Sequence, residues 1–361
     1  MKLLFIGYLH GFGGAEKQLI MLSNEMARRG HYVYLLSLSQ NNPCYSIESS
    51  VHYVFNEDKS NSKILKVLER YKYLKKQLLD IQPDLVISFN VQPAFMCALM
   101  SEDIAKKTIY AERGDPYDKE YSGVNGVLRK YMMKRISGFI FQTKGARDFF
   151  SEDVKNRSTV INNPIFINPD DYPRELDLDK RIVTVGRLHE QKNQKLFIQA
   201  IANLSSKYSE YSAEIYGDGT LEKELQKQID ESGTKIKIKL MGAHKDVLNR
   251  IKNASVFVLT SDYEGMPNAL MEAMALGIPC VSTDCRPGGA HELIQDGVDG
   301  FIVKCGDYKC ICERIEEILE DKKLAETISI NAKKKMRMFV SYKIYDRWEN
   351  FFLNQIKNKK G

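Results

Sequence analysis

Short β-rich runs alternate with segments of helical periodicity along the chain, and this alternation stops once and then resumes. In the first half the candidate strands are residues 2–7, 32–38, 51–55, 84–88, 107–111, 138–142 and 158–161. In the second half they are residues 181–186, 212–217, 236–241, 255–260 and 278–283. Strands that alternate with helices build doubly wound parallel sheets. The sequence therefore predicts an α/β protein with two Rossmann-like domains.

A proline-rich segment separates the two halves. It contains Pro164, Pro169 and Pro173 together with several aspartates, a composition that interrupts both helices and strands. At roughly 150 residues per domain, a chain of 361 residues has room for two domains. We expect a first domain over residues 1–165, a linker over 166–180 and a second domain over 181–341.

The last segment, residues 342–361, has a separate pattern. Trp348, Phe351, Phe352 and Ile356 recur there at helical spacing. Such spacing predicts a helix that packs its apolar face against a neighbouring element.

Composition narrows the class of protein. The net charge of +6 suits an anionic partner. The first apolar run ends at Gly7 without a cleavage site, which favours a first strand over a signal peptide. No apolar run approaches the ~20 residues that a spanning helix needs. We therefore expect a cytoplasmic protein.

The seven cysteines are expected to be reduced thiols. Their number is odd, and Cys305, Cys310 and Cys312 lack the paired spacing of a zinc knuckle. Asp177 and Asp179 match the Asp-X-Asp of metal-dependent sugar transferases, but they lie in the predicted linker and are given no role. No metal site is predicted.

Two cations follow the first strand of the second half. Arg187 comes directly after Gly186, and Lys192 precedes the next helical run. Ligands of open parallel sheets bind beyond the carboxyl ends of the strands. A guanidinium can chelate phosphate oxygens and an ammonium adds a point charge, so the pair suits a diphosphate, although both could also be solvated loop cations.

A second motif follows the strand at residues 255–260. Pro267 suits the first position of a helix that runs to Leu276, with Met266 as its cap. Met266 offers no side-chain acceptor, so the amides of Asn268 and Ala269 are available to a bound phosphate.

Two carboxylates belong to the same motif. Glu264 precedes the helix and Glu272 lies inside it, so they can reach different parts of an elongated polyhydroxyl ligand. An acidic first turn that complements the helix dipole would explain Glu264 alone.

Glycine-containing loops follow several other strands. Gly217 and Gly242 lie at the same predicted sheet edge, where glycine permits a ligand to approach the backbone. In the first half, Gly13 and Gly14 follow the first strand and open a helix, but Glu16 stands where a dinucleotide fingerprint has its third glycine. A nicotinamide-dependent enzyme is therefore disfavoured.

These motifs resemble those of the retaining glycosyltransferases of family four. The resemblance rests on the run from Gly186 to Asn193, on Glu264 and Glu272 with seven residues between them, and on the segment from Glu292 to Gly300. It implies a GT-B fold of two Rossmann-like domains with parallel sheets, a C-terminal crossover helix that returns to the first domain, and no cofactor or metal beyond the nucleotide sugar, which is a co-substrate.

The resemblance also implies roles for individual residues. Arg187 and Lys192 would bind the donor diphosphate, Glu264 the sugar hydroxyls and Glu272 the ribose, while Gly14 would let the first domain approach the phosphates. The catalytic residues expected are Arg187, Lys192 and Glu264. The expected donor-binding residues are Gly13, Gly14, Gly186, Gly217, Gly242, Ala243, Gly265, Met266, Pro267, Asn268, Ala269, Leu270 and Glu272.

The first-domain loop departs from the family pattern. Many relatives have a histidine where this chain has Arg113 and Asp115, which become candidate acceptor residues. The amino-acid sequence of this loop is similar to that of bacterial enzymes that build surface polysaccharides. The resemblance implies transfer of a hexose or N-acetylhexosamine, from a UDP-sugar by family habit, to a glycan that can be polyprenyl-diphosphate-linked.

A basic helix over residues 63–79 allows a membrane contact. Its stripe of Ile64, Val67, Tyr71, Leu74 and Leu78 lies among basic residues, as in helices that lie on anionic membranes. A stripe that packs on the sheet is the commoner arrangement and remains open.

One alternative to an enzyme also remains open, a catalytically silent partner subunit that binds a nucleotide sugar. A nucleic-acid binder is not expected, because the basic residues are scattered over helices.

Overall fold

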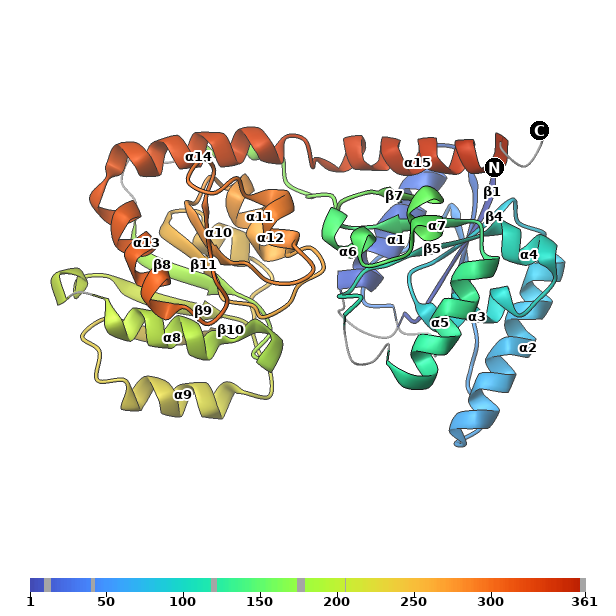
Figure 1. The fold of residues 1–361 in the computed structure, drawn as a ribbon, viewed down its shortest axis with the longest axis horizontal. Coiled ribbons are helices and arrows are strands. Elements are labelled where there is room, and N and C mark those ends of the chain that lie inside the picture. The colour runs from blue at the N-terminus through green and yellow to red at the C-terminus, as the bar shows by residue number, and fades with distance from the viewer. Residues whose placement is uncertain (10–13, 40–42, 118–121, 174–178, 205, 358–361) are drawn as a thin grey trace. The chain divides into compact units, whose positions relative to one another are not determined.

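The structure is a computed structural model that describes residues 1–9, 14–39, 43–117, 122–173, 179–204 and 206–357 (Figure 1). The chain divides into two compact units. Unit 1 comprises residues 1–162 and 345–361, and unit 2 comprises residues 163–344. The chain thus leaves unit 1 after Asn162 and returns to it at Tyr345.

Unit 1 contains a parallel sheet in the order β3-β2-β1-β4-β5-β6-β7. Its strands are β1 (Lys2–Gly7), β2 (Tyr32–Ser37), β3 (Val51–Phe55), β4 (Leu85–Ser88), β5 (Thr108–Ala111), β6 (Gly138–Phe141) and β7 (Ser158–Val160). Its helices are α1 (Gly14–Arg28), α2 (Lys63–Ile81), α3 (Val91–Ala98), α4 (Glu102–Lys107), α5 (Gly123–Arg135), α6 (Lys144–Asp148), α7 (Glu152–Asn156) and most of α15 (Ser341–Lys357).

Alternation along β1 separates the two faces of this sheet. Leu4 and Ile6 pack in one core with residues of α2 and α3, whereas the ring of Phe5 lies 6.3 Å from that of Phe352 in α15. Successive side chains of a strand point to opposite faces. The predicted C-terminal helix therefore packs its apolar face on the sheet of unit 1.

Unit 2 repeats the arrangement with the order β10-β9-β8-β11-β12-β13. Its strands are β8 (Asp179–Val185), β9 (Ser212–Tyr216), β10 (Lys237–Gly242), β11 (Ala254–Leu259), β12 (Cys280–Thr283) and β13 (Phe301–Val303). Its α-helices are α8 (Gln194–Asn203), α9 (Glu222–Glu231), α10 (Val247–Ile251), α11 (Asn268–Ala275), α12 (Gly289–Leu293), α13 (Tyr308–Glu320) and α14 (Lys322–Met336). Short 3₁₀ turns are η2 (Pro169–Asp171), η3 (Glu190–Lys192) and η4 (Ser206–Tyr208).

The segment predicted as a linker is packed where the structure describes it. The amide of Ile165 donates to the carbonyl of Phe339 at 2.8 Å, and Arg337 pairs with Asp170 at 2.6 Å. These contacts attach residues 163–173 to the end of α14. Asp177 lies outside the described residues, and Asp179 is the first residue of β8.

In both sheets the strands are added first on one side of the first strand and then on its other side, while all of them stay parallel. In unit 1 the resulting switch point lies between β1 and β4, and in unit 2 it lies between β8 and β11. Such a sheet binds ligands in the crevice at the carboxyl ends of these two strands. Each unit therefore has one topologically favoured place for a site.

Candidate active site

Two loops meet at the switch point of unit 2 and are joined by hydrogen bonds. The loop after β11 donates from the amide of Asp262 to the carbonyl of Gln191 at 2.9 Å, and the Gln191 side chain donates to the carbonyl of Tyr263 at 2.8 Å. The hydroxyl of Thr260 donates to the carbonyl of Lys192 at 2.9 Å. These bonds fix the backbone on both sides of Lys192.

Lys192 and Glu264 form an ion pair across the switch point. Their side chains are 18% and 9% exposed, so the pair lies mostly out of water. The hydroxyl of Ser261 donates to the same Glu264 oxygen at 2.8 Å. The Glu264 amide donates to the carbonyl of Arg286 at 2.7 Å. The sequence predicted both charged residues at this edge, but it did not predict their direct contact or the contribution of Ser261.

Arg187 has a different environment. It is exposed, and its guanidinium forms no ion pair with any residue that the structure describes. Its backbone is held, because the side chain of Gln194 donates to the Arg187 carbonyl at 2.8 Å. A guanidinium on a fixed backbone at the edge of a sheet can bind an anion without first losing a protein partner.

Close backbone packing requires glycine in the neighbouring loop. A Cβ atom at Gly217 would lie 2.0 Å from the carbonyl oxygen of Gly186, and one at Gly219 would lie 2.3 Å from that of Leu188. The amide of Gly217 donates to the carbonyl of Gly242 at 2.9 Å. The carboxyl ends of β8, β9 and β10 are therefore in direct backbone contact. Ala243, directly after β10, is exposed.

Gly186 leaves room for the Lys192 side chain. A Cβ at this position would lie 3.3 Å from the Lys192 side chain. Its absence lets the aliphatic part of Lys192 lie over the backbone on its way to Glu264.

Helix α11 begins one residue later than predicted. Pro267, not Met266, is the N-cap, Asn268 is the first helical residue, and the helix ends at Ala275 instead of Leu276. Proline favours an extended backbone that can precede a helix as well as start one, and Pro267 has ψ 100°. The N-cap residue Pro267 makes no side-chain hydrogen bond to the helix, so the amides of Asn268, Ala269 and Leu270 at its start have no partner from the capping side chain.

Two contacts hold the start of α11, and the sequence predicted neither contact, although the glycines at 288 and 289 indicated a close backbone approach at this edge of the sheet. Gly289 packs on it so closely that a Cβ there would lie 2.7 Å from the carbonyl oxygen of Gly265. The Asn163 amide contacts the Met266 sulfur at 3.1 Å, and the Asn163 side chain donates to Asn268 at 3.0 Å. Asn163 immediately precedes a proline in a segment that was interpreted only as a break between domains.

The remaining predicted residues have these positions. Glu272 lies on α11 and is partly buried. Gly14 is the first residue of α1 in unit 1, and Gly13 lies outside the described residues. Arg113 and Asp115 follow β5 in unit 1.

Arg113 contacts two aromatic rings that stack on each other. Its guanidinium lies 4.4 Å from the centre of the Phe89 ring and 4.9 Å from that of Trp348, a geometry typical of cation–π contacts. Burial lowers the pKa of Arg113, while the neighbouring Glu112 carboxylate opposes that shift. Asp115 is buried and accepts from the amide of Tyr117 at 2.9 Å.

Glu112 was not predicted as a site residue, yet it organises this loop. Its carboxylate accepts from the Tyr110 hydroxyl at 2.8 Å and from the amides of Arg113 and Gly114 at 3.1 and 3.2 Å. Burial raises the pKa of Glu112, against the opposing effect of these hydrogen bonds. Its position directly after a buried strand was the available sequence signal.

Two features are absent from the described residues. No three His, Cys, Asp or Glu side chains gather there in a way that could hold a metal ion. Within the same residues, no helix is long and apolar enough to cross a membrane.

Known proteins match the chain in both units. The model of the family described as glycosyl transferases group 1 matches residues 172–335, and that of glycosyltransferase family 4 matches residues 12–168. A Campylobacter jejuni relative, the GalNAc-alpha-(1->4)-GalNAc-alpha-(1->3)-diNAcBac-PP-undecaprenol alpha-1,4-N-acetyl-D-galactosaminyltransferase, is 26% identical over 99% of both chains. An Escherichia coli relative, the UDP-Gal:alpha-D-GlcNAc-diphosphoundecaprenol alpha-1,3-galactosyltransferase, is 30% identical over 48% of this chain and 46% of its own.

Solved structures share the fold. Anabaena Alr3699/HepE in complex with UDP matches with a TM-score of 0.81 at 20% identity, over 98% of this chain and 100% of the other. The lipopolysaccharide outer core galactosyltransferase WaaB matches with a TM-score of 0.78 at 19% identity and the same coverage. With two parallel-sheet units, matched in turn by the two family models, the chain belongs to the family 4 glycosyltransferases and has their GT-B fold.

Proposed function

We propose that this protein transfers a hexose or an N-acetylhexosamine from a UDP-sugar to a lipid-linked glycan, with retention of anomeric configuration and without a metal ion. The observation that carries the proposal is the Lys192–Glu264 pair beside exposed Arg187 and the uncapped start of α11. Relatives that transfer sugars to undecaprenyl-linked glycans, and a structural neighbour in complex with UDP, support the substrate classes.

Unit 2 is proposed to hold the donor. Arg187 and Lys192 bind the diphosphate, and the amides at the start of α11 donate to anionic oxygens. Glu264 accepts from sugar hydroxyls, and Glu272 accepts from the ribose. Lys192 can bind the diphosphate while Glu264 still accepts the hydrogen bond from the Ser261 hydroxyl, because that bond does not involve the lysine.

The proposed reaction is a same-face substitution. The bond between the anomeric carbon and the diphosphate oxygen breaks, and the acceptor hydroxyl oxygen forms a bond to that carbon. The hydroxyl proton passes to the departing diphosphate. Negative charge grows on the leaving group, and cations already fixed beside it stabilise that charge without reorganisation.

Unit 1 is proposed to hold the acceptor, with Arg113 and Asp115 as candidate contacts and Gly14 near the donor phosphates. We further propose a cytoplasmic protein with peripheral contact at the inner face of the cell membrane. The undecaprenyl-linked substrates in the relatives' names support this location, since such lipids reside in a membrane.

The experiment that tests the proposal is calorimetric titration with UDP, GDP, ADP and NAD, with EDTA present, on the wild type and on Arg187→Ala. We expect UDP to bind, and to bind at least tenfold more weakly to the variant. Lys239→Ala, which removes an exposed cation from β10, is the matched control and should leave binding unchanged. Preference for another nucleotide would change the proposed donor. UDP binding that appears only when Mg²⁺ replaces the EDTA would exclude metal-independent binding.

A second measurement separates an enzyme from a silent partner subunit. Slow release of UDP from UDP-hexoses and UDP-N-acetylhexosamines is expected even without acceptor, because water can attack the same carbon. Tight binding of UDP together with no release from any UDP-sugar would favour the silent subunit.

A further inference from the structure

The switch point of unit 1 holds a pocket of about 640 Å³, which is within the ~300–1,000 Å³ of small-molecule sites. Tyr8 after β1 and Phe89 after β4 line its inner end. Its walls come from α2, α3 and α5. Apart from the amides of Asn90, Gln92 and Asn125 and the hydroxyls of Tyr8 and Tyr71, the lining side chains are apolar.

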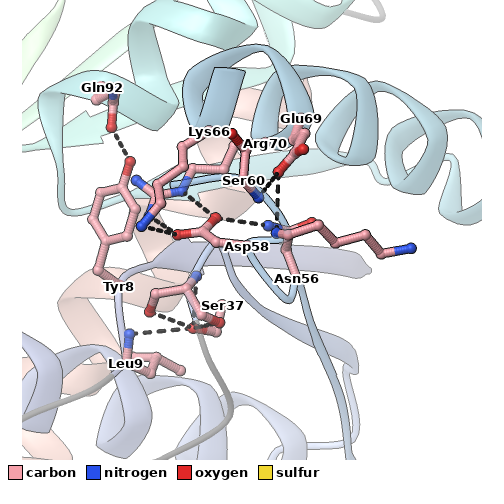
Figure 2. A network of polar contacts seen from close by, with 12 residues as sticks. Tyr8, Leu9, Ser37, Asn56, Asp58, Ser60, Lys66, Glu69, Arg70 and Gln92 are labelled. Carbon is pink, nitrogen blue, oxygen red and sulfur yellow. Dashed lines mark hydrogen bonds and ion pairs between the residues drawn. The ribbon is translucent and has the colours of Figure 1, made fainter. Parts of the chain in front are cut away.

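A chain of polar contacts attaches α2 to the inner end of this pocket. Figure 2 shows Tyr8 donating to Gln92, and Arg70 of α2 paired with Asp58. The Arg70 guanidinium also lies 5.2 Å from the centre of the Tyr8 ring. The first half of α2 is therefore attached by polar contacts. Its apolar side chains are not needed for that attachment.

The predicted packing of the α2 stripe on the sheet is correct only for the second half of the helix. Leu74 and Leu78 are buried, whereas Ile64 is 74% exposed and Val67 38% exposed. Leu68 of α2 and Leu99, just after α3, both line the pocket and are 49% and 48% exposed. Apolar side chains gathered at the mouth of an apolar pocket mark an interaction site.

The helices beside the pocket carry an excess of positive charge. Helix α2 contains six Lys and Arg residues against Glu69 and Asp80, and α5 contains four against none. Lys66 and Arg70 share one carboxylate, that of Asp58. Several lysines of the two helices have no ion pair within the described part of the chain: Lys63, Lys72, Lys75, Lys76, Lys130 and Lys134.

We infer that this pocket receives the hydrocarbon segment next to the phosphate of the lipid-linked acceptor, with the phosphate near Lys66 and Arg70. The inference rests on the proposed function for the identity of the lipid. A sugar ring fits the pocket poorly, since its hydroxyls would find few polar partners and Gln92 is already engaged by Tyr8. An apolar chain attached to an anion matches both the walls and the surrounding charge.

The test uses farnesyl diphosphate as a soluble probe, with inorganic diphosphate, farnesol and a single-chain phosphatidylglycerol as comparisons. Binding is measured by calorimetry below the micellar concentration of each lipid. Burial of each methylene strengthens binding roughly fourfold, so farnesyl diphosphate should bind at least tenfold more tightly than diphosphate. Farnesol should bind more weakly than farnesyl diphosphate, because it lacks the anion.

Matched variants separate the pocket from general adsorption. Leu68→Gln and Leu99→Gln change pocket walls and should weaken farnesyl diphosphate at least tenfold. Ile64→Gln and Val127→Gln remove exposed apolar side chains from α2 and α5 that do not line the pocket, and should change binding less than twofold.

Equal weakening in all four variants would overturn the inference, and so would diphosphate binding as tight as that of farnesyl diphosphate. A pocket-dependent preference for the phosphatidylglycerol would also overturn it, because that result would assign the pocket to bilayer lipid. The experiment needs no nucleotide. Loss of UDP binding with intact pocket-dependent farnesyl diphosphate binding would therefore reject the proposed donor site and leave the lipid pocket standing, and the reverse result would do the opposite.

Discussion

The two units place different chemistry at the same topological position. In unit 2 the loops after β8 and β11 bring Lys192 and Glu264 into contact. In unit 1 the segments after β1 and β4 supply Tyr8 and Phe89 to an apolar pocket. Strand order therefore fixes where a site lies, and the few residues after each strand decide whether it suits charged phosphates or a hydrocarbon.

The two sites also differ in how they are held. Backbone hydrogen bonds and glycine contacts join the loops of unit 2, as at Gly217 and Gly242. The wall of the unit 1 pocket is a helix held by side-chain contacts such as that of Arg70 with Asp58. A site that must stabilise growing charge gains from a fixed backbone, whereas a site for a flexible chain does not need one.

The largest effect that we expect is on turnover at the polar switch point. Lys192→Ala should lower the rate of sugar transfer by a factor of ~10²–10³, the usual result of removing one fixed group from a charge-stabilising site. Lys195→Ala removes a partly exposed lysine three residues later, whose ion pairs are with Glu190 and Glu224, and should leave the rate within twofold. Steady-state kinetics with saturating donor would measure both, and an unchanged rate for Lys192→Ala would remove this residue from the proposed chemistry.

The next effect concerns stability. Glu264→Gln leaves the Lys192 ammonium without its carboxylate, so the free energy of unfolding should fall by up to ~3 kcal/mol. The double variant Lys192→Met, Glu264→Gln should recover much of that loss and remain inactive. Denaturant unfolding of unit 2 and a transfer assay test this together. Recovery of activity in the double variant would mean that the pair is only structural.

A third test addresses the fixed backbone of unit 2. Gly217→Ala would place a methyl group against the Gly186 carbonyl, so it should weaken UDP at least tenfold and lower stability by about 2 kcal/mol. Gly233 also has a positive φ, but nothing lies within 4 Å of a Cβ there. Gly233→Ala should therefore cost only about 1 kcal/mol, with UDP affinity retained. Equal affinities in the two variants would contradict the role of close packing.

The smallest effect is expected in the loop that holds Arg113. Because burial raises the pKa of Glu112, protonation favours folding; this stabilisation is complete below pH ~4.5 and is lost as pH rises through the folded pKa. Glu112→Gln should lose less stability than the wild type as the pH rises from 4.5 to 7, because the amide does not ionise. Thermal unfolding across that range measures it, with exposed Glu152→Gln as the control. Parallel pH profiles for wild type and Glu112→Gln would show that the carboxyl ionises freely.

Much of this fold could be predicted because the chain alternates regularly. Every predicted strand exists, with ends shifted by up to a few residues, and the pattern placed Lys192 and Glu264 after the two strands that flank a switch point. Strand β13 was missed, since Phe301–Val303 is too short to show a period. The start of α11 was placed one residue early, because proline is compatible with both neighbouring positions.

The contacts between distant segments could not be predicted. Asn163 reaches Met266 and Asn268, and the unit 1 pocket combines side chains from segments far apart along the chain. The stripe on α2 looked uniform in sequence, yet only its second half is covered. Periodicity identifies an apolar face, but it does not say how far the sheet beneath that face extends.

The return of the C-terminal helix to unit 1 has a consequence for the order of maturation in the cell. Phe352 is fully buried beside Phe5, so the part of the sheet around Phe5 is covered completely only after residues that follow unit 2 in the chain have been synthesised. All of unit 2, residues 163–344, is synthesised before Phe352. The core of unit 2 can therefore be completed first. Unit 1 begins earlier in the chain, but its core is complete only after the part of α15 that belongs to it has been added.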